Sequence, residues 1–240
     1  MSQQRCSALA RICVAGGLAA SLAAPLQAAV LDEIVVTAQK REQDIQDVGI
    51  SISAFTGEQM ETLGIQSSSE IAAFVPGVHT SGALAGQNKQ FTIRGVTQAD
   101  FNDIVEAPNA VYLDEGYIAV AQAQTFALFD IERVEILKGP NALIFGRGGT
   151  GGIINRIIKE ADGIDRNDFL LRAGSYAFYR AQADVGDTAN DNLAYRFSAL
   201  YENSGSFRDG VTTELAGLTP SMAFGVGANS RMVLTAEGYY

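Results

Sequence analysis

Thiols and histidines are scarce in this sequence. Its only two cysteines, Cys6 and Cys13, lie within the first 28 residues, and His79 is its only histidine. If that N-terminal segment is removed, the mature chain has no thiol for a disulfide, a thiolate metal site or a nucleophile. A single histidine cannot build a multi-histidine metal site, and no catalytic triad has both its nucleophile and its base. We therefore expect no catalytic residue, no metal site and no cofactor.

Long apolar runs are also missing. Beyond residue 29 no stretch approaches the roughly 18 apolar residues that a transmembrane helix needs. In the N-terminal segment, Arg5 and Arg11 precede an apolar run at 12–24, and small residues surround Ala28. This order is typical of a signal peptide, whereas an inner-membrane anchor would need a longer run, richer in Leu and Ile. We predict that residues 1–28 are a cleaved signal peptide and that the protein is exported.

Basic residues are fewer than acidic ones. The chain has 17 Lys and Arg against 27 Asp and Glu, a formal net charge of −10 at pH 7. Such a charge argues against a nucleic-acid partner, although it identifies no solute. With 47% apolar and 18% charged residues, the chain can nevertheless bury a core.

A strand-like segment and a polar stretch come before a region of mixed α and β character. Residues 33–38 are strand-like and are followed by a polar stretch at 39–47, which favours a strand on a tether over the first strand of a folded domain. From residue 48 the elements are short. We expect capping boxes at Thr56 and Ser67 to start helices that end near Gly64 and Pro76. Strands are expected at 50–54, 91–95, 110–113 and 134–137, and a helical turn from Pro140 to 145.

After residue 161 the pattern changes to longer alternating strands. Tyr195, Phe197 and Tyr201 alternate with polar Arg196 and Ser198, as in the wall of a membrane barrel. Six of the eight tyrosines lie in this part of the chain. A soluble β-sandwich also alternates and remains an alternative. Because a few strands cannot close a barrel, we expect the chain to hold only its first strands, with a polar external loop at 203–219.

The most informative stretch runs from 131 to 155 and includes IERVEILKGPNALIFG and TGGIIN. It resembles the plug-domain signature of TonB-dependent outer-membrane receptors. FTIRGV at 91–96, VPGV at 75–78 and VYLDEG at 111–116 carry the same resemblance, and residues 33–38 are similar to a TonB box. The resemblance implies an α+β plug domain at 48–160, a TonB box and linker at 29–47, and the first antiparallel strands of a truncated transmembrane β-barrel at 161–240.

The resemblance also implies roles for individual residues. The TonB-binding strand would be Glu33, Ile34, Val35, Val36, Thr37 and Ala38. The structural motifs of the plug would be Arg94, Gly95, Glu135, Lys138, Gly139, Pro140, Gly146, Gly151 and Gly152. Arg94 and Glu135 sit in apolar strands, so we expect both charges to be paired. In the family, plug arginines meet acidic groups of the barrel, and Lys138 stands where many relatives have arginine, which removes a bidentate fork.

The function implied by the resemblance is TonB-dependent uptake of a scarce solute, such as an iron-siderophore complex, across the outer membrane. The expected partners are TonB, an extracellular small molecule and outer-membrane lipid. Candidate solute contacts are His79, Gln98, Phe101 and Tyr117. The alternative is a plug-like binding module that does not transport, located in the periplasm or at the cell surface.

One glycine motif matches the fingerprint of a third class, a periplasmic dinucleotide enzyme, but its surroundings do not fit. Residues 146–151 satisfy G-x-G-x-x-G, the dinucleotide fingerprint. That fingerprint needs a helix directly after it, whereas the β-branched residues from Ile153 onwards are strand-like. A P-loop is excluded because no Gly-Lys-Ser/Thr ends the glycine run. We therefore interpret these glycines as a tight loop that needs close backbone approach.

Overall fold

The computed structural model describes residues 34–240, apart from 38, 39, 42, 84–87, 99–104, 147 and 229. The predictions for the signal peptide and for Glu33, Ala38 and Phe101 lie outside the described residues. Residues 34–240 group into one compact unit. Within them, no helix combines the length and the apolar character that crossing a bilayer requires.

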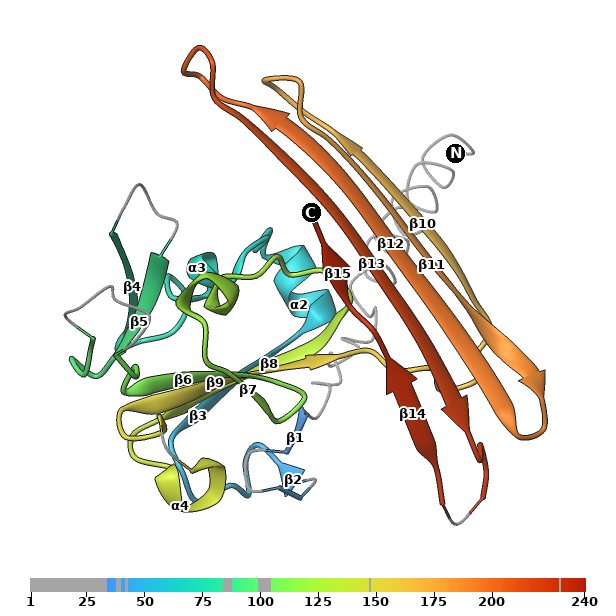
Figure 1. The fold of residues 1–240 in the computed structure, drawn as a ribbon, viewed down its shortest axis with the longest axis horizontal. Coiled ribbons are helices and arrows are strands. Elements are labelled where there is room, and N and C mark those ends of the chain that lie inside the picture. Colours follow the sequence, from blue (N-terminus) through green and yellow to red (C-terminus); the bar gives the residue numbers. More distant parts are fainter. Residues whose placement is uncertain are drawn as a thin grey trace, which may run out of the picture. The chain divides into compact units, whose positions relative to one another are not determined.

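Five strands form the sheet that organises residues 52–158, called here the first sheet. Its strand order is β3-β8-β9-β6-β7, and only the β6–β9 pair is parallel (Figure 1). The strands are β3 (Ile52–Thr56), β6 (Asn109–Leu113), β7 (Gly116–Ile118), β8 (Ile131–Lys138) and β9 (Gly152–Ile158). Central β8 and β9 are rich in isoleucine and valine, which suits strands that are covered on both faces.

Short elements cover the two faces of this sheet. Helices α2 (Gly57–Thr62) and α3 (Ser68–Ile71) lie on one side, and α4 (Ala142–Phe145) lies on the other, beside β1 (Val35–Val36) and β2 (Gln43–Asp44). The hairpin of β4 (Val78–Ala83) and β5 (Asn88–Ile93) forms a separate two-stranded sheet, and a 3₁₀ turn, η2, spans Ala121–Gln124.

The start of α2 confirms the first predicted capping box. The Thr56 hydroxyl accepts from Gln59 N at 3.2 Å, and the Gln59 side chain accepts from Thr56 N at 3.2 Å. The second predicted box is wrong. The Ser67 hydroxyl contacts the Ser69 hydroxyl at 2.9 Å, and Glu70 accepts from Gln66 N instead. With its cap diverted in this way, α3 is a single turn that ends at Ile71, short of Pro76.

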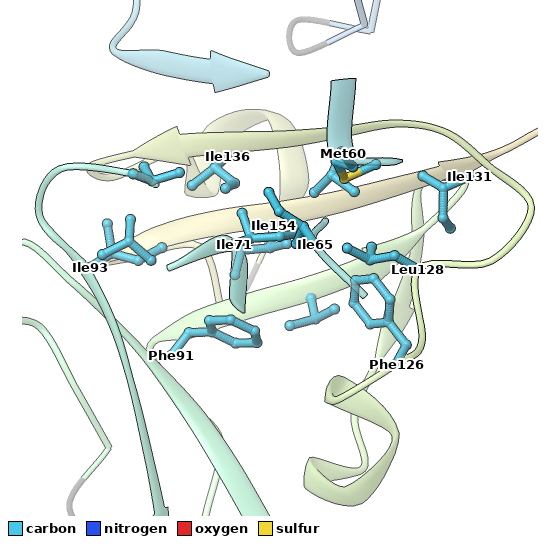
Figure 2. Packing of buried hydrophobic residues seen from close by; sticks show 14 of the residues in the cluster. Met60, Ile65, Ile71, Phe91, Ile93, Phe126, Leu128, Ile131, Ile136 and Ile154 are labelled. Atoms are coloured by element: carbon cyan, nitrogen blue, oxygen red, sulfur yellow. The ribbon is translucent and has the colours of Figure 1, made fainter. Parts of the chain in front are cut away.

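Side-chain alternation along the strands separates two hydrophobic clusters. Ile136 and Ile154 point into a first cluster with Met60, Phe91 and Phe126, shown in Figure 2. Their strand neighbours Leu137 and Ile153 point to the opposite face. There they form a second cluster with Val36 of β1 and with Ala110 and Tyr112 of β6. The N-terminal strand therefore packs into the second cluster.

Residues from 166 onwards form a second, antiparallel sheet in the order β10-β11-β12-β13-β14, with β15 also paired to β13. The strands are β10 (Arg166–Ala173), β11 (Tyr179–Asn190), β12 (Leu193–Gly205), β13 (Thr212–Phe224), β14 (Met232–Thr235) and β15 (Gly238–Tyr239). The polar residues expected in a loop at 203–219 lie largely in β12 and β13, so that loop is shorter than predicted. Backbone pairing of Asn203 with Glu214 and of Ser204 with Thr213 extends both strands, because ladder hydrogen bonds form regardless of side-chain polarity.

Candidate functional site

The N-terminal strand is docked rather than free. Val35 and Val36 pair antiparallel with Asp44 and Gln43. Val36 is fully buried in the second cluster, whereas Val35 is 45% exposed. This β-branched pair therefore has one residue that anchors the strand and one that faces outward, as the period of a strand requires.

The edge of β1 that points away from β2 is partly occupied. Ile45 N donates to Ile34 O at 3.0 Å, so the backbone of Ile34 faces β2. Backbone groups in a strand alternate between its two edges, and the polar groups of Val35 and Thr37 therefore face the other edge. There Thr37 N donates to Glu135 Oε1 at 2.7 Å. A strand added at this edge would compete with Glu135 for that donor.

Three residues form this contact, which we call the Glu135 latch: Thr37, Arg133 and Glu135. Glu135 lies in β8 with its side chain fully buried, and Arg133 Nε donates to its Oε1 at 2.9 Å. Arg133 Nη2 also donates to Thr37 Oγ1 at 3.2 Å. A buried carboxylate needs such a cation nearby, so the expected pairing of Glu135 is present.

The position of Arg94 differs from the predicted one. It lies in the turn after β5 with a left-handed φ of 52°, and its side chain is exposed. Its N–H donates to Gly77 O at 2.7 Å, and the following Gly95 also has a positive φ, of 81°. The expected buried charge in an apolar strand is therefore wrong, because the strand ends at Ile93 and the chain reverses. The Arg94 side chain passes close to Gly139, where an added Cβ would lie 3.4 Å from Nη1.

The other motif residues support the first sheet. Lys138 Nζ donates to Ser53 Oγ at 3.1 Å, linking β8 to β3. Pro140 stands just before α4, and Gly146 ends that helix with a φ of 78°. A Cβ at Gly151 would lie 2.4 Å from Asn109 Oδ1, and one at Gly152 would lie 2.7 Å from the carbonyl oxygen of Leu137. These last two glycines therefore permit close packing.

The candidate solute contacts fall in two places. His79 is exposed on β4 opposite Thr92, whose hydroxyl donates to the Thr97 hydroxyl beside Gln98. Tyr117, by contrast, packs in the second cluster, with its ring centroid 5.6 Å from that of Tyr112. The structure thus places His79 on the β4–β5 hairpin, Gln98 in the segment that follows this hairpin, and Tyr117 near the docked N-terminal strand. Their role as solute contacts stays a prediction.

Sequence reasoning missed several charged residues that join the two sheets. Arg196 of β12 pairs with Asp130, which precedes β8, and Arg156 of β9 pairs with Glu237 at 2.6 Å. The only sequence signal was the polar side of the alternation around Arg196. In the part of the chain that the structure describes, no group of three or more His, Cys, Asp or Glu side chains is arranged to hold a metal ion.

Comparison with known proteins finds similarity in the part of the chain that contains the first sheet. The family model of the TonB-dependent receptor plug domain matches residues 44–153. The chain is 25% identical over 202 residues to the ferrioxamine receptor of Yersinia enterocolitica, covering 83% of this chain and 28% of that protein. It is 29% identical over 154 residues to the vitamin B12 transporter BtuB of Photobacterium profundum, covering 64% and 25% of the two proteins.

The similarity extends to solved structures. The open form of the ferric-catecholate import receptor Fiu from E. coli K12 aligns with a TM-score of 0.69 and 25% identity, over 86% of this chain and 30% of that one. The chain thus spans between 25% and 30% of the length of these relatives. The predicted fold class is confirmed: a plug domain is followed by antiparallel strands that resemble the barrel of such receptors.

Proposed function

Because residues 44–153 belong to the TonB-dependent receptor plug domain family, we propose that this protein takes part in TonB-dependent uptake of a scarce solute across the outer membrane. Of the two relatives compared above by sequence, one is a ferrioxamine receptor and the other a vitamin B12 transporter. An iron-siderophore or similar chelate is therefore the proposed class of solute. His79 on the β4–β5 hairpin and Gln98 in the segment after it are the first positions at which to seek its contacts.

The second sheet supports a location in the outer membrane. On β12, Tyr195, Phe197 and Tyr201 are exposed, whereas Arg196 and Glu202 on the opposite face are buried. In the wall of a membrane barrel, apolar side chains face outward to the lipid and charged side chains face inward. A soluble sandwich has the reverse arrangement. This inverted face is the observation, besides the plug itself, that carries the proposal.

The proposed organisation follows from both parts. A signal peptide at 1–28 would direct export, and residues 29–47 would hold the TonB box and linker. The plug would occupy 48–160 and gate a barrel whose wall begins after 161. The ion pairs between Asp130 and Arg196 and between Arg156 and Glu237 would hold the plug to that wall.

TonB would bind by adding a strand to β1. In this mode of recognition, backbone hydrogen bonds provide the affinity. The docked strand offers little to a partner, because β2 covers one edge, Glu135 holds Thr37 N at the other, and Val36 is buried. The β1 strand must therefore leave the plug before TonB can bind it.

Val35 offers the cleanest test of this coupling. Its side chain is partly exposed and its N–H faces away from β2, so Val35→Pro removes a donor that an added strand would use without emptying the core. We expect this variant to abolish uptake of radioiron supplied as ferrioxamine or as a catecholate chelate, and of labelled cobalamin. Binding of the transported probe to isolated outer membranes should remain unchanged.

Val35→Ala is the matched control, because it shortens the same side chain but keeps the backbone donor. Uptake should remain near the wild-type rate in this variant. Normal uptake by Val35→Pro would contradict the assignment of β1 as the TonB-binding strand.

A further inference from the structure

The guanidinium of Arg196 joins three segments of the chain. Its Nη1 donates to the carbonyl oxygen of Lys159, just after β9, at 3.0 Å. Its Nη2 donates to Asp130 Oδ1, just before β8, and to Asp184 Oδ2 on β11 at 2.6 Å. The Arg196 side chain is 1% exposed. One buried cation of the second sheet therefore holds the end of the first sheet.

The same two acids also share a hydroxyl. Ser198 Oγ lies 3.1 Å from Asp130 Oδ1 and 3.1 Å from Asp184 Oδ1. A hydroxyl has a single hydrogen to donate, so Ser198 can serve only one of these carboxylates at a time. Asp130 and Asp184 therefore share Arg196 as a donor and compete for the hydrogen of Ser198.

The charges in this cluster are unbalanced, since two carboxylates face one guanidinium. Burial raises the pKa of Asp130, and the nearby Asp184 raises it further, while Arg196 and Ser198 lower it. The Asp130 side chain is 1% exposed, whereas that of Asp184 is 18% exposed. Asp184 thus repels Asp130, and its partial contact with solvent makes its own charge less costly.

We propose that Asp184 is a positioning residue for plug release, because it keeps Arg196 paired when Asp130 leaves. Breaking a buried ion pair normally leaves one charge uncompensated, which is strongly unfavourable. Here Arg196 and Ser198 of β12 both already contact a second acceptor, Asp184, on the neighbouring strand β11. The plug can separate without leaving a lone buried cation. This inference rests on the proposed function, in which the plug must move.

The test is the rate at which a constant pulling force on the N-terminus extracts the plug from the intact protein, measured on single molecules in detergent. Asp184→Asn removes both the repulsion and the second acceptor charge, so extraction should slow by on the order of tenfold or more. Asp130→Asn weakens the plug's own contact and should speed extraction. Asp187→Asn is the control, because Asp187 is an exposed acid on the same strand that lies opposite Tyr195, and its extraction rate should stay near that of wild type.

A conservative variant completes the test. Asp184→Glu keeps the negative charge and should restore a rate near that of wild type, which loss of packing alone would not predict. If Asp184→Asn speeds extraction, or leaves the rate unchanged, the proposal is overturned, since a merely stabilising network would weaken with either loss. The readout needs neither TonB nor solute. A failure here is therefore distinguishable from a failure of uptake in the Val35→Pro experiment.

Discussion

At the residue scale, one buried carboxylate links the N-terminal strand to the plug. Glu135 is fully buried in β8, and Oε1 receives both Thr37 N and Arg133 Nε. Its other oxygen has no hydrogen-bond partner among the described residues. A charge held in this way is sensitive to neutralisation, because ion pairing and a charge-assisted hydrogen bond are lost together.

Glu135→Gln should therefore loosen the docked strand. The amide can still accept from Thr37 N, but the pairing with Arg133 is lost. We expect the purified periplasmic domain of TonB to bind the solute-free protein roughly tenfold more tightly, as expected from about 1.5 kcal/mol of lost docking energy. Titration calorimetry measures this affinity.

The control is Glu132→Gln, which removes the half-exposed partner of the same arginine. Exposed pairs contribute little, so its effect on TonB affinity should be small. Equal affinities in wild type and Glu135→Gln would show that the latch does not restrain β1.

At the element scale, the antiparallel pair β8–β9 supports the plug. Its residues alternate between the two hydrophobic clusters: Ile153 belongs to the second, and Ile154 to the first, which Figure 2 shows. Gly152 begins β9 at a point where β5 and β8 both come close. A Cβ there would meet Ile93 Cδ1 at 2.6 Å and the Leu137 carbonyl oxygen at 2.7 Å. The side chain could rotate away, but the backbone oxygen could not.

Gly152→Ala should consequently destabilise the plug by about 1–3 kcal/mol, the usual range for overpacking. The measurement is urea-dependent hydrogen exchange of the β8 and β9 amides in the intact protein. Gly49→Ala is the matched control, because a Cβ at Gly49 has nothing within 4 Å. A stability change of less than about 0.5 kcal/mol in Gly152→Ala, the range of neutral surface substitutions, would contradict the packing argument.

At the scale of the whole molecule, the second sheet presents opposite chemistry on its two faces. Phe169, Leu171, Phe197 and Leu218 are exposed, whereas Arg180 and Glu202 form a buried ion pair at 2.8 Å on the inner face. A large exposed apolar surface marks a site that contacts lipid or another protein. With the plug against the polar face, lipid is the occupant that we propose for the apolar face.

Phe197→Arg should impair membrane insertion, by about 2–4 kcal/mol if residue 197 lies near the middle of the bilayer. The folded fraction in outer-membrane vesicles, read from heat-modifiable gel migration, measures the effect. Phe207→Arg is the control, because Phe207 is 75% exposed in the loop between β12 and β13. Equal folded fractions in the two variants would rule out lipid at Phe197.

Local patterns predicted elements well where the chemistry is local. The Thr56 capping box depends on residues three apart, and the alternation on β12 depends on neighbours in one strand. Errors arose where several partners compete for one group. Ser67 contacts Ser69, two residues away, instead of capping its helix, and Arg94 lies in a turn where its N–H donates to Gly77 O. The residue types alone do not decide which of these partners is bound.

The sequence by itself predicted the plug domain, the fold class and the alternating strands, because motifs, strand period and glycine positions are read from residues that lie close together in the chain. Only the tertiary structure decided which charges meet. Thr37 and Glu135 are 98 residues apart, and Asp130 and Arg196 are 66 apart. Partners at such separations are set by how sheets pack. The docked N-terminal strand and the shared arginine therefore had to be seen in the fold.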